Sequence, residues 1–148
     1  MRRVGEQFLR KVNYVRRYGV YAILPIGEAL LLTHQVSINC EFQLPGGGLD
    51  PAEQPIPALH REIMEETGWS ITKPRKVGLF RRFVFMPEYK LWADKICSVY
   101  LARPVRRVCD PTEKGHTDHI VPIKLASEIV ENPGDRKFIL DFLEGRLS

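Results

Sequence analysis

The chain has 148 residues, of which 44% are hydrophobic and 27% are charged. This length favours one domain, expected to span residues 1–148, and the composition is ordinary for a globular protein. No apolar run approaches the roughly 20 residues that a membrane span needs, and the N-terminus lacks the continuous apolar segment of a secretory signal. The sequence therefore argues against a membrane protein and against a secreted one.

The net charge of +4 and the pI near 9.1 indicate an anionic partner. A phosphorylated small molecule explains this charge as well as nucleic acid does, and we do not expect nucleic acid. Several arginines and lysines lie in residues 1–16, which are predicted to be either a basic N-terminal extension or a solvated surface. The three cysteines form no CxxC pair, which is typical of a reducing compartment, so we expect the cytoplasm.

Short β-rich runs predict a series of strands or extended pieces along the chain: Tyr18–Leu24, Ala29–Thr33, Glu41–Leu44, Val77–Phe85, Lys95–Ala102 and His119–Ile123. Residues 25–28 are predicted to be a hairpin turn between the first two runs. Pro104–Gly115 is charged and carries no strand pattern, so a long loop is expected there.

A helix is predicted from Pro55 or Pro57, because proline suits the first turn, to Gly68, a good residue for ending a helix. Its apolar stripe is expected to pack on a sheet: Ile56, Leu59, Ile63 and Met64. Two short helices should close the chain, the second over Asp135–Glu144. The core-facing stripe of that second helix is predicted to be Phe138, Ile139, Phe142 and Leu143. This mixed order of strands and helices implies an α/β sandwich with a mixed sheet.

The helix after the glycines carries an unusual concentration of negative charge. Glu62, Glu65 and Glu66 project from one face, at positions i, i+3 and i+4. Like charges at this spacing repel by roughly 0.2–0.5 kcal/mol per pair, and no lysine on the helix offsets them. Carboxylate oxygens are ligands that Mg²⁺ and Mn²⁺ prefer. The pattern therefore predicts a site for Mg²⁺ or Mn²⁺.

The same segment fills every fixed position of the Nudix box at the right spacing: Gly47, Glu53, Arg61, Glu62, Ile63, Glu65, Glu66, Gly68 and Trp69. It resembles the MutT-like Nudix hydrolases, with no subfamily assigned, although Trp69 stands where the family more often has an aliphatic residue. The resemblance implies an α/β/α sandwich with a curved mixed sheet. It also implies metal-dependent hydrolysis of nucleoside diphosphates linked to another group.

Similarity to the box also implies roles for individual residues. Glu65 and Glu66 correspond to direct metal ligands, joined by the backbone carbonyl of Gly46. Glu62 corresponds to a further ligand or to the general base, and both alternatives stay open. Arg61 resembles the arginine that orients the carboxylates of the helix through a salt bridge.

Supporting roles are implied for Gly47 and Glu53. Some members of the family add a catalytic glutamate from a loop beyond the box. Glu113 is our candidate for that glutamate because of its position in a loop, with Asp110 and Asp118 behind it.

Three further pairs have both functional and ordinary interpretations: His116 and His119 as an HxxH metal site, Arg81 and Arg82 as phosphate contacts, and Tyr89 and Trp92 as stacking partners of a base. Zinc would need ligands beyond the two histidines, and the other residues suit a solvated strand face or ordinary packing.

The substrate is the least constrained prediction. Pro87 and Tyr89 lie where ADP-ribose and dinucleoside polyphosphate hydrolases, respectively, tend to carry such residues, and we lean to ADP-ribose or a nucleotide sugar. The alternatives are a nucleoside or deoxynucleoside triphosphate, a dinucleoside polyphosphate, the 5′ end of RNA, and a non-catalytic nucleotide sensor. A homodimer is possible, as in many relatives.

Overall fold

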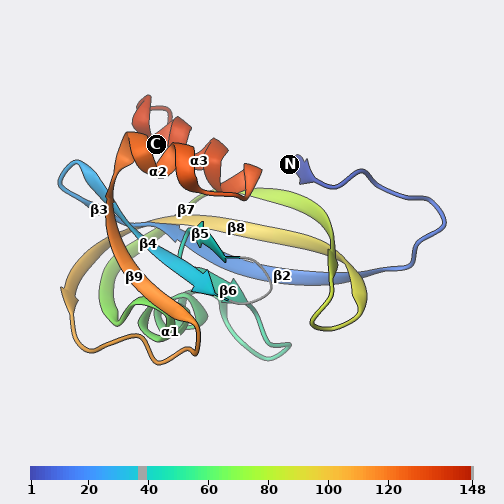
Figure 1. Ribbon diagram of the computed structural model, residues 1–148, viewed down its shortest axis with the longest axis horizontal. Helices are drawn as coiled ribbons and strands as arrows, with labels where there is room; N and C mark the ends of the chain where they lie inside the picture. The colour runs from blue at the N-terminus through green and yellow to red at the C-terminus, as the bar shows by residue number, and fades with distance from the viewer. Residues whose placement is uncertain (37–39, 148) are drawn as a thin grey trace.

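The computed structural model describes residues 1–36 and 40–147 (Figure 1). Its elements, in chain order, are β1 Arg2–Gly5, β2 Tyr14–Ile23, β3 Pro25–Ile26, β4 Ala29–Val36, β5 Cys40–Gln43, β6 Gly46–Gly48, α1 Pro55–Thr67, β7 Trp69–Met86, β8 Leu91–Arg107, β9 His116–Pro122, α2 Ile123–Ile129 and α3 Pro133–Leu143. The predicted helices and strands are all present, and most of the strands are longer than the sequence indicated. The hairpin predicted at residues 25–28 is confirmed, since Pro25 pairs with Leu30 and Ile26 with Ala29.

In the described chain the strands form two sheets that lie between the helices. The larger sheet has the order β1-β7-β8-β2-β6, and the smaller one joins β3, β4 and β5, with β9 on the free side of β4. The larger sheet is mixed: β1 and β7 are parallel, as are β8 and β2, while the other pairs are antiparallel. Helix α1 lies on one side, and α2 and α3 lie on the other (Figure 1). The predicted α/β/α sandwich with a mixed sheet is confirmed.

Two core clusters hold these layers together. One lies under α1, where Leu59 and Ile63 are fully buried, and the other includes Phe138 and Ile139 of α3. Ile56 is 43% exposed and Leu143 is 45% exposed, so the predicted stripes are wrong at these two residues. They occupy the first turn of α1 and the last residue of α3, and the ends of both helices therefore project beyond the cores.

The loop predicted at Pro104–Gly115 is wrong in its first part, because β8 continues to Arg107 alongside β7. Pro104 pairs with Ile71 and Arg107 with Trp69, and a register shift lies beside Ile71. Proline cannot donate a ladder hydrogen bond, so an irregular position suits it. The strand predicted at His119–Ile123 begins earlier, at His116, and Ile123 already belongs to α2.

The basic segment at residues 1–16 contributes to the larger sheet. Arg2–Gly5 pairs in parallel with residues 80–83 of β7, and β2 already begins at Tyr14. Among the described residues, no helix combines the length and the apolar character that crossing a bilayer requires.

Candidate active site

Strand β6 packs on β2 through a backbone contact that only glycine permits. Gly46 pairs with Tyr21 of β2 at a φ of +148°, and a Cβ atom there would lie 2.0 Å from the carbonyl oxygen of Val20. Without a side chain, the Gly46 N–H reaches the helix and donates to Oε1 of Glu66 at 3.0 Å. At the other end of α1, a Cβ at Gly68 would meet the carbonyl oxygen of Cys109, at 1.8 Å. Gly46, just before the box, and Gly68, within it, are therefore both required by close packing.

Gly47 makes room for a carboxylate. A Cβ atom at Gly47 would lie 2.5 Å from the carboxyl carbon of Glu62, whereas one at Gly48 would find its nearest neighbour, the carbonyl oxygen of Tyr18, at 3.9 Å. Glu62 thus occupies the space directly over Gly47.

Gly47→Ala is expected to displace the Glu62 carboxylate and to lower kcat by about 10²-fold, the cost of moving a reacting group by about 1 Å. Gly48→Ala makes the same chemical change in the same strand, with room for the methyl group, and should leave kcat unchanged. Steady-state kinetics on the two variants checks this. Equal losses would show that the strand, rather than the position of Glu62, limits the reaction.

Arg61 is held among three carboxylates. It lies 2.8 Å from Glu53, 3.1 Å from Glu65 and 3.2 Å from Glu62, measured between nitrogen and oxygen atoms. Glu53 also accepts the backbone N–H of Asp50 at 3.0 Å. That backbone hydrogen bond, together with Arg61, holds the pKa of the Glu53 carboxyl below its usual value. The arrangement suits Glu53 as the residue that fixes Arg61 at the start of the helix.

Glu66 is the most deeply buried carboxylate of the helix, with a side chain only 9% exposed. Burial raises its pKa well above the usual value, and repulsion by Glu62, Glu113 and Glu65 adds to this, while the Gly46 N–H opposes it. Burial likewise raises the pKa of Glu62, with further contributions from Glu65 and Glu113. The chain therefore gathers negative charge where water is scarce, an arrangement that costs stability unless a cation arrives.

Glu113, proposed from its loop position alone, is brought to this cluster. The N–H groups of Thr112 and Glu113 both donate to the backbone carbonyl of Glu65, each at 2.9 Å. The loop is thereby anchored on α1, and the Glu113 carboxylate is close enough to raise the pKa of Glu62 and Glu66.

The two alternatives to Glu113 are engaged elsewhere. Asp118 and Asp110 lie 2.8 Å and 2.9 Å from Arg107, and Asp118 also accepts the indole N–H of Trp69 at 3.2 Å. The contact with Asp118 gives the unusual tryptophan of the box a structural role, because its N–H finds a partner while the ring packs on the core beside α1.

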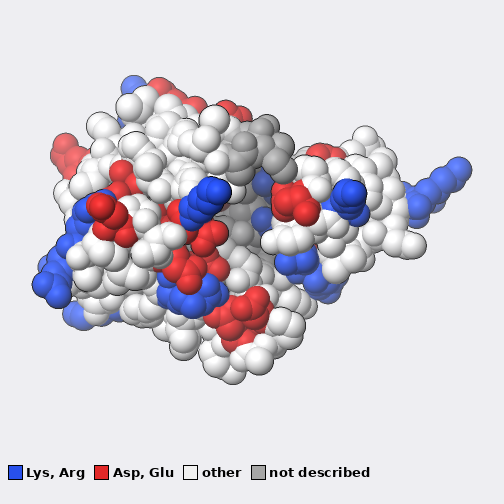
Figure 2. Space-filling view, turned by 60° about the horizontal axis from the view of Figure 1, so that its bottom comes forward, with Lys and Arg blue, Asp and Glu red and all other residues white. Residues whose placement is uncertain are grey.

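The donor set fits a divalent cation. Carboxylates approach from one helix and one loop, with the backbone of the glycine strand β6 alongside, and oxygen ligands suit Mg²⁺ or Mn²⁺. Seen from the side of α1, acidic side chains gather beside a hollow in the surface (Figure 2). In the described part of the chain, no three acidic, histidine or cysteine side chains stand close enough together to hold a metal as they are. Glu65 pairs with Arg61, and Glu66 accepts the Gly46 N–H through Oε1, which leaves its Oε2 without a hydrogen bond from any described residue.

A family model described as NUDIX domain matches residues 14–142. The chain belongs to the Nudix family. A Bacillus subtilis (strain 168) protein named "Putative 8-oxo-dGTP diphosphatase" is 32% identical over 123 residues, covering 83% of this chain and 76% of that protein. The RNA pyrophosphohydrolase of Helicobacter pylori (strain G27) is 41% identical over 39 residues, covering 26% of this chain and 25% of that protein. The solved NUDIX hydrolase from Nitrosomonas europaea shares the fold, with a TM-score of 0.73 at 19% identity, covering 90% of this chain and 92% of that one.

The protein is thus a MutT-like Nudix hydrolase that acts on pyrophosphate bonds. Enzymes of this family generally depend on a divalent metal, which agrees with the chemistry of the carboxylate cluster.

The HxxH pair does not converge in this Nudix fold. Three residues apart on β9, His116 and His119 point to opposite faces. Nε2 of His116 lies 3.6 Å from Oε2 of Glu66, and its Nδ1 lies 2.8 Å from the hydroxyl oxygen of Thr33. His119 instead packs against Phe42. His116 is therefore a neighbour of Glu66, a role that the sequence spacing did not suggest.

The members of the other two predicted pairs, Arg81 with Arg82 and Tyr89 with Trp92, also have different surroundings. Arg81 forms an ion pair with Asp94 at 2.8 Å, as does Arg16 at 2.9 Å, so Arg81 is committed to the sheet. Tyr89 is 56% exposed beneath the guanidinium of Arg17, and Trp92 packs on Tyr14 and Phe85.

Arg82 belongs to a polar cluster that sequence reasoning missed. Its Nε is buried and has no hydrogen-bond partner among the described residues. Asp135 of α3, Lys95 and Tyr21 complete the cluster: Arg82 and Lys95 act on the pKa of Asp135, and Lys95 lies 3.5 Å from the Tyr21 hydroxyl. Asp135 is 3% exposed and accepts the N–H of Leu44 at 3.1 Å. In the sequence, Asp135 follows Asn132 and Pro133 and looks like an ordinary acidic residue in the first turn of a helix.

Proposed function

We propose that this chain hydrolyses a purine nucleoside triphosphate whose base is oxidised at C8, releasing a nucleoside monophosphate and pyrophosphate. Mg²⁺ or Mn²⁺ is proposed to bind at Glu62, Glu65 and Glu66, with the carbonyl of Gly46. The buried carboxyl of Asp135, set beside the glycine strand, carries the proposal. The similarity to the Bacillus subtilis relative supports it.

The segment before β6 links this carboxyl to the catalytic helix. The Leu44 N–H donates to Asp135 at 3.1 Å, and two residues later the Gly46 N–H donates to Glu66 at 3.0 Å. Residues i and i+2 of an extended chain are about 7 Å apart. A single nucleotide can span that distance, with its phosphates at α1 and its base beside Asp135.

Asp135 is suited to recognising an oxidised purine. Burial raises its pKa to about 7, against the opposing effects of the Leu44 N–H, Arg82 and Lys95. Guanine presents acceptors at both N7 and O6. Oxidation at C8 turns N7 into an N–H donor while O6 stays an acceptor. An ionised Asp135 accepts from that N–H, and Arg82 and Lys95 supply positive charge that favours the ionised carboxylate.

The chain's own groups position the reaction at the other end of the site. In-line attack of water on a phosphoryl group forms one P–O bond, breaks the P–O bond to the leaving group, and releases a proton. The leaving group is pyrophosphate for attack at the α-phosphorus and the nucleoside monophosphate for attack at the β-phosphorus. The bound metal would neutralise the charge on the phosphoryl oxygens and lower the pKa of a bound water. Glu62 and Glu113 are the candidates to accept the proton, and Arg61 with Glu53 holds the helix carboxylates in place.

A substrate panel with Mg²⁺ and with EDTA tests the proposal: 8-oxo-dGTP, dGTP, ADP-ribose, a dinucleoside tetraphosphate and a 5′-triphosphorylated RNA. We expect turnover only with Mg²⁺, with the highest kcat/KM for 8-oxo-dGTP and pyrophosphate as product. Faster hydrolysis of ADP-ribose or of RNA would overturn the assignment. The RNA arm is included because of the short match to the Helicobacter pylori enzyme.

A further inference from the structure

His116 meets the most deeply buried carboxylate of α1. Its Nε2 atom lies 3.6 Å from Oε2 of Glu66, and the two side chains are only 6% and 9% exposed. The Gly46 N–H donates to the other carboxylate oxygen, Oε1, at 3.0 Å, and in residues 1–36 and 40–147 no hydrogen bond reaches Oε2. A shift of about 0.5 Å would bring the imidazole within hydrogen-bond distance. His116 is therefore in position to hold the oxygen that Gly46 does not.

Thr33 fixes the orientation of the imidazole ring. Its hydroxyl oxygen lies 2.8 Å from Nδ1 of His116, and the threonine is fully buried. On the paired strands β4 and β9, His116 stands opposite Gln35 and Thr33 stands opposite Asp118. Residues two positions apart share one face of a sheet, so the histidine and the threonine lie diagonally side by side. The register of the two strands thus sets the direction of the ring.

The position of the imidazole proton follows from its two neighbours. A carboxylate that binds a metal is ionised, and a lone pair on Nε2 would be repelled by the negative Oε2 of Glu66, whereas an N–H is attracted. Nδ1 is then the acceptor, and the Thr33 hydroxyl donates to it. The same hydroxyl lies 3.5 Å from the carbonyl oxygen of Glu66, so its 2.8 Å contact with His116 is the stronger one. Donation therefore runs from Thr33 through His116 to Glu66.

The backbone around His116 is tied to the same cluster. Its N–H donates to the carbonyl of Glu113 at 3.2 Å, and the Glu113 N–H donates to the carbonyl of Glu65 at 2.9 Å. On the side of β4, the Gly115 carbonyl accepts the Val36 N–H at 2.8 Å. These contacts hold the start of β9 against both α1 and β4. A partner fixed in this way can hold a metal ligand in its productive orientation.

We propose that His116 is a positioning residue of the metal site. Its Nε2–H donates to Oε2 of Glu66 and, together with the Gly46 N–H on Oε1, fixes the orientation of this carboxylate for a bound divalent cation. The inference rests on the proposed role of Glu66 as a metal ligand. Carboxylates that bind metals are themselves hydrogen-bonded, and loss of such a partner lowers metal affinity or activity by roughly 10–100-fold.

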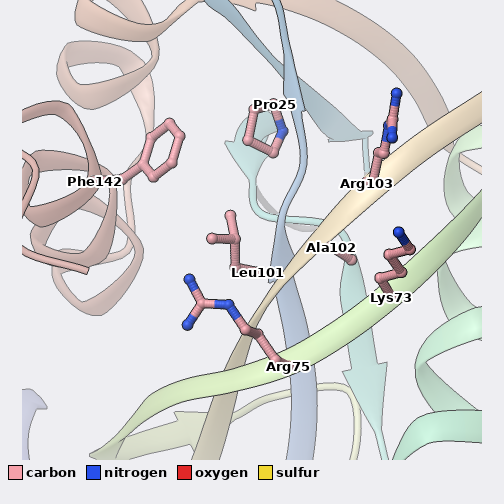
Figure 3. Close-up of a pocket in the computed structure, with 7 residues that line it drawn as sticks. All are labelled: Pro25, Lys73, Arg75, Leu101, Ala102, Arg103 and Phe142. Atoms are coloured by element: carbon pink, nitrogen blue, oxygen red, sulfur yellow. The ribbon is translucent and has the colours of Figure 1, made fainter. Parts of the chain in front are cut away.

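The pocket shown in Figure 3 is separate from this contact. It has a volume of about 300 Å³, and its lining includes Phe142 of α3 and Arg103 of β8. Neither Glu66 nor His116 lines it. A substitution at His116 therefore changes the surroundings of the carboxylate and leaves the lining of this pocket intact.

The test is a titration of the metal-free protein with Mn²⁺, followed by the electron paramagnetic resonance signal of the free ion. His116→Leu removes the donor and is expected to raise the Kd for Mn²⁺ by about tenfold or more. His116→Gln is the rescue variant, because its amide supplies an N–H near the place of Nε2, and its Kd should stay within about threefold of the wild-type value. His119→Leu is the matched control on β9. His119 packs against Phe42, so this variant should bind Mn²⁺ like the wild type.

A second variant covers the case in which His116→Leu fails to fold, as judged by circular dichroism. Thr33→Val keeps nearly the same shape and removes only the hydroxyl that orients the ring. It is expected to raise the Kd for Mn²⁺ by about threefold or more, since the donor is kept but less well oriented. An unchanged Kd in Thr33→Val would then overturn the inference.

The outcomes separate this inference from the proposed function. Equal Kd values for the wild type and His116→Leu would overturn the role of His116 and leave the metal site in place. Equal losses in His116→Leu and His116→Gln would overturn it too, because the shape of the ring, and not its N–H, would then matter. A wild-type protein that binds no Mn²⁺ would overturn the proposed metal site and this inference with it. No substrate is present, so the choice of nucleotide is decided separately by the substrate panel.

Discussion

Glu66→Gln is expected to lower kcat by on the order of 10²–10³-fold, the usual cost of removing one electrostatic contact to the transition state. The amide keeps the size of the side chain, and its oxygen still accepts the Gly46 N–H, so the fold is retained. The charge that attracts the metal is lost. Kinetics with saturating Mg²⁺ measures the loss of kcat. The loss of metal affinity is measured by the rise in Tm that Mg²⁺ causes, which should be large in the wild type and small in the variant.

The same variant should be more stable than the wild type when no metal is present. The folded-state pKa of Glu66 is raised by burial and by its acidic neighbours, so the folded protein binds this proton more tightly than the unfolded chain does. Stability linked to this group is therefore present at low pH and is lost as the pH rises through the folded pKa. In EDTA, the Tm of Glu66→Gln should exceed that of the wild type at pH 8, and the difference should shrink toward pH 4.

Glu88→Gln provides the control. Glu88 is exposed in the turn between β7 and β8, so this substitution removes the same charge far from the site. It should affect neither kcat nor the response of Tm to Mg²⁺. Hydrolysis by Glu66→Gln at the wild-type rate would contradict the role given to the helix carboxylates.

Helix α1 was predictable because its determinants are local. Pro55 and Gly68 fix its ends, and the spacing of Glu62, Glu65 and Glu66 fixes their shared face. The relative positions of residues on one helix follow from helix geometry, so they can be predicted without the rest of the fold. Glu113 was suggested only by its loop, and what places it is a pair of backbone hydrogen bonds to Glu65, which depend on how β8 and β9 leave the sheets.

The surroundings of Glu66 and Asp135 were not predictable in this way. Thr33 and His116 meet Glu66 only because β4 and β9 pair across a wide separation in sequence. Asp135 reaches Leu44 only when α3 docks on the sheet. Long-range pairing of this kind leaves no periodic pattern in the sequence. The sequence alone also does not distinguish a buried aspartate from an exposed one.

The substrate preference drawn from Pro87 and Tyr89 rested on proximity in sequence to the box. The two residues lie in the turn between β7 and β8, next to Trp92, which pairs with Tyr14 of β2. Tyr14 is seven residues from Tyr21, the partner of Gly46, and seven extended residues span about 23 Å. The turn is therefore remote from Gly46, at the opposite end of β2.

Asp135→Asn is expected to reduce the preference for 8-oxo-dGTP over dGTP, expressed as the ratio of kcat/KM values, by at least about tenfold. A site built around a hydrogen bond rejects a ligand that lacks the matching group far more strongly than an apolar pocket does. Asparagine keeps the acceptor for the Leu44 N–H but carries no charge. The asparagine amide can pair with either purine. The control is Glu131→Gln, which removes the charge of an exposed carboxylate just before α3.

The pH dependence separates recognition from a general loss of activity. With a folded pKa of about 7, Asp135 becomes an acceptor for the N7–H of the oxidised base as the pH rises through neutrality. The wild-type preference for 8-oxo-dGTP should therefore increase between pH 6 and pH 8, and that of Asp135→Asn should stay flat. A flat wild-type profile would contradict the role of Asp135 in reading the base.

Stability gives an independent check on the same group. Burial raises the pKa of Asp135 from 3.8 to about 7. Between these two pH values, the unfolded chain releases this proton more readily, so rising pH lowers the stability of the folded protein. Above about pH 7 the group is ionised in both states and has no further effect on stability. Titration of the other carboxylates is common to both proteins. The Tm of Asp135→Asn minus that of the wild type should thus increase from pH 4 to pH 7 and then level off. A constant difference would mean that Asp135 ionises normally, and that its carboxylate is solvated rather than enclosed between α3 and the sheet.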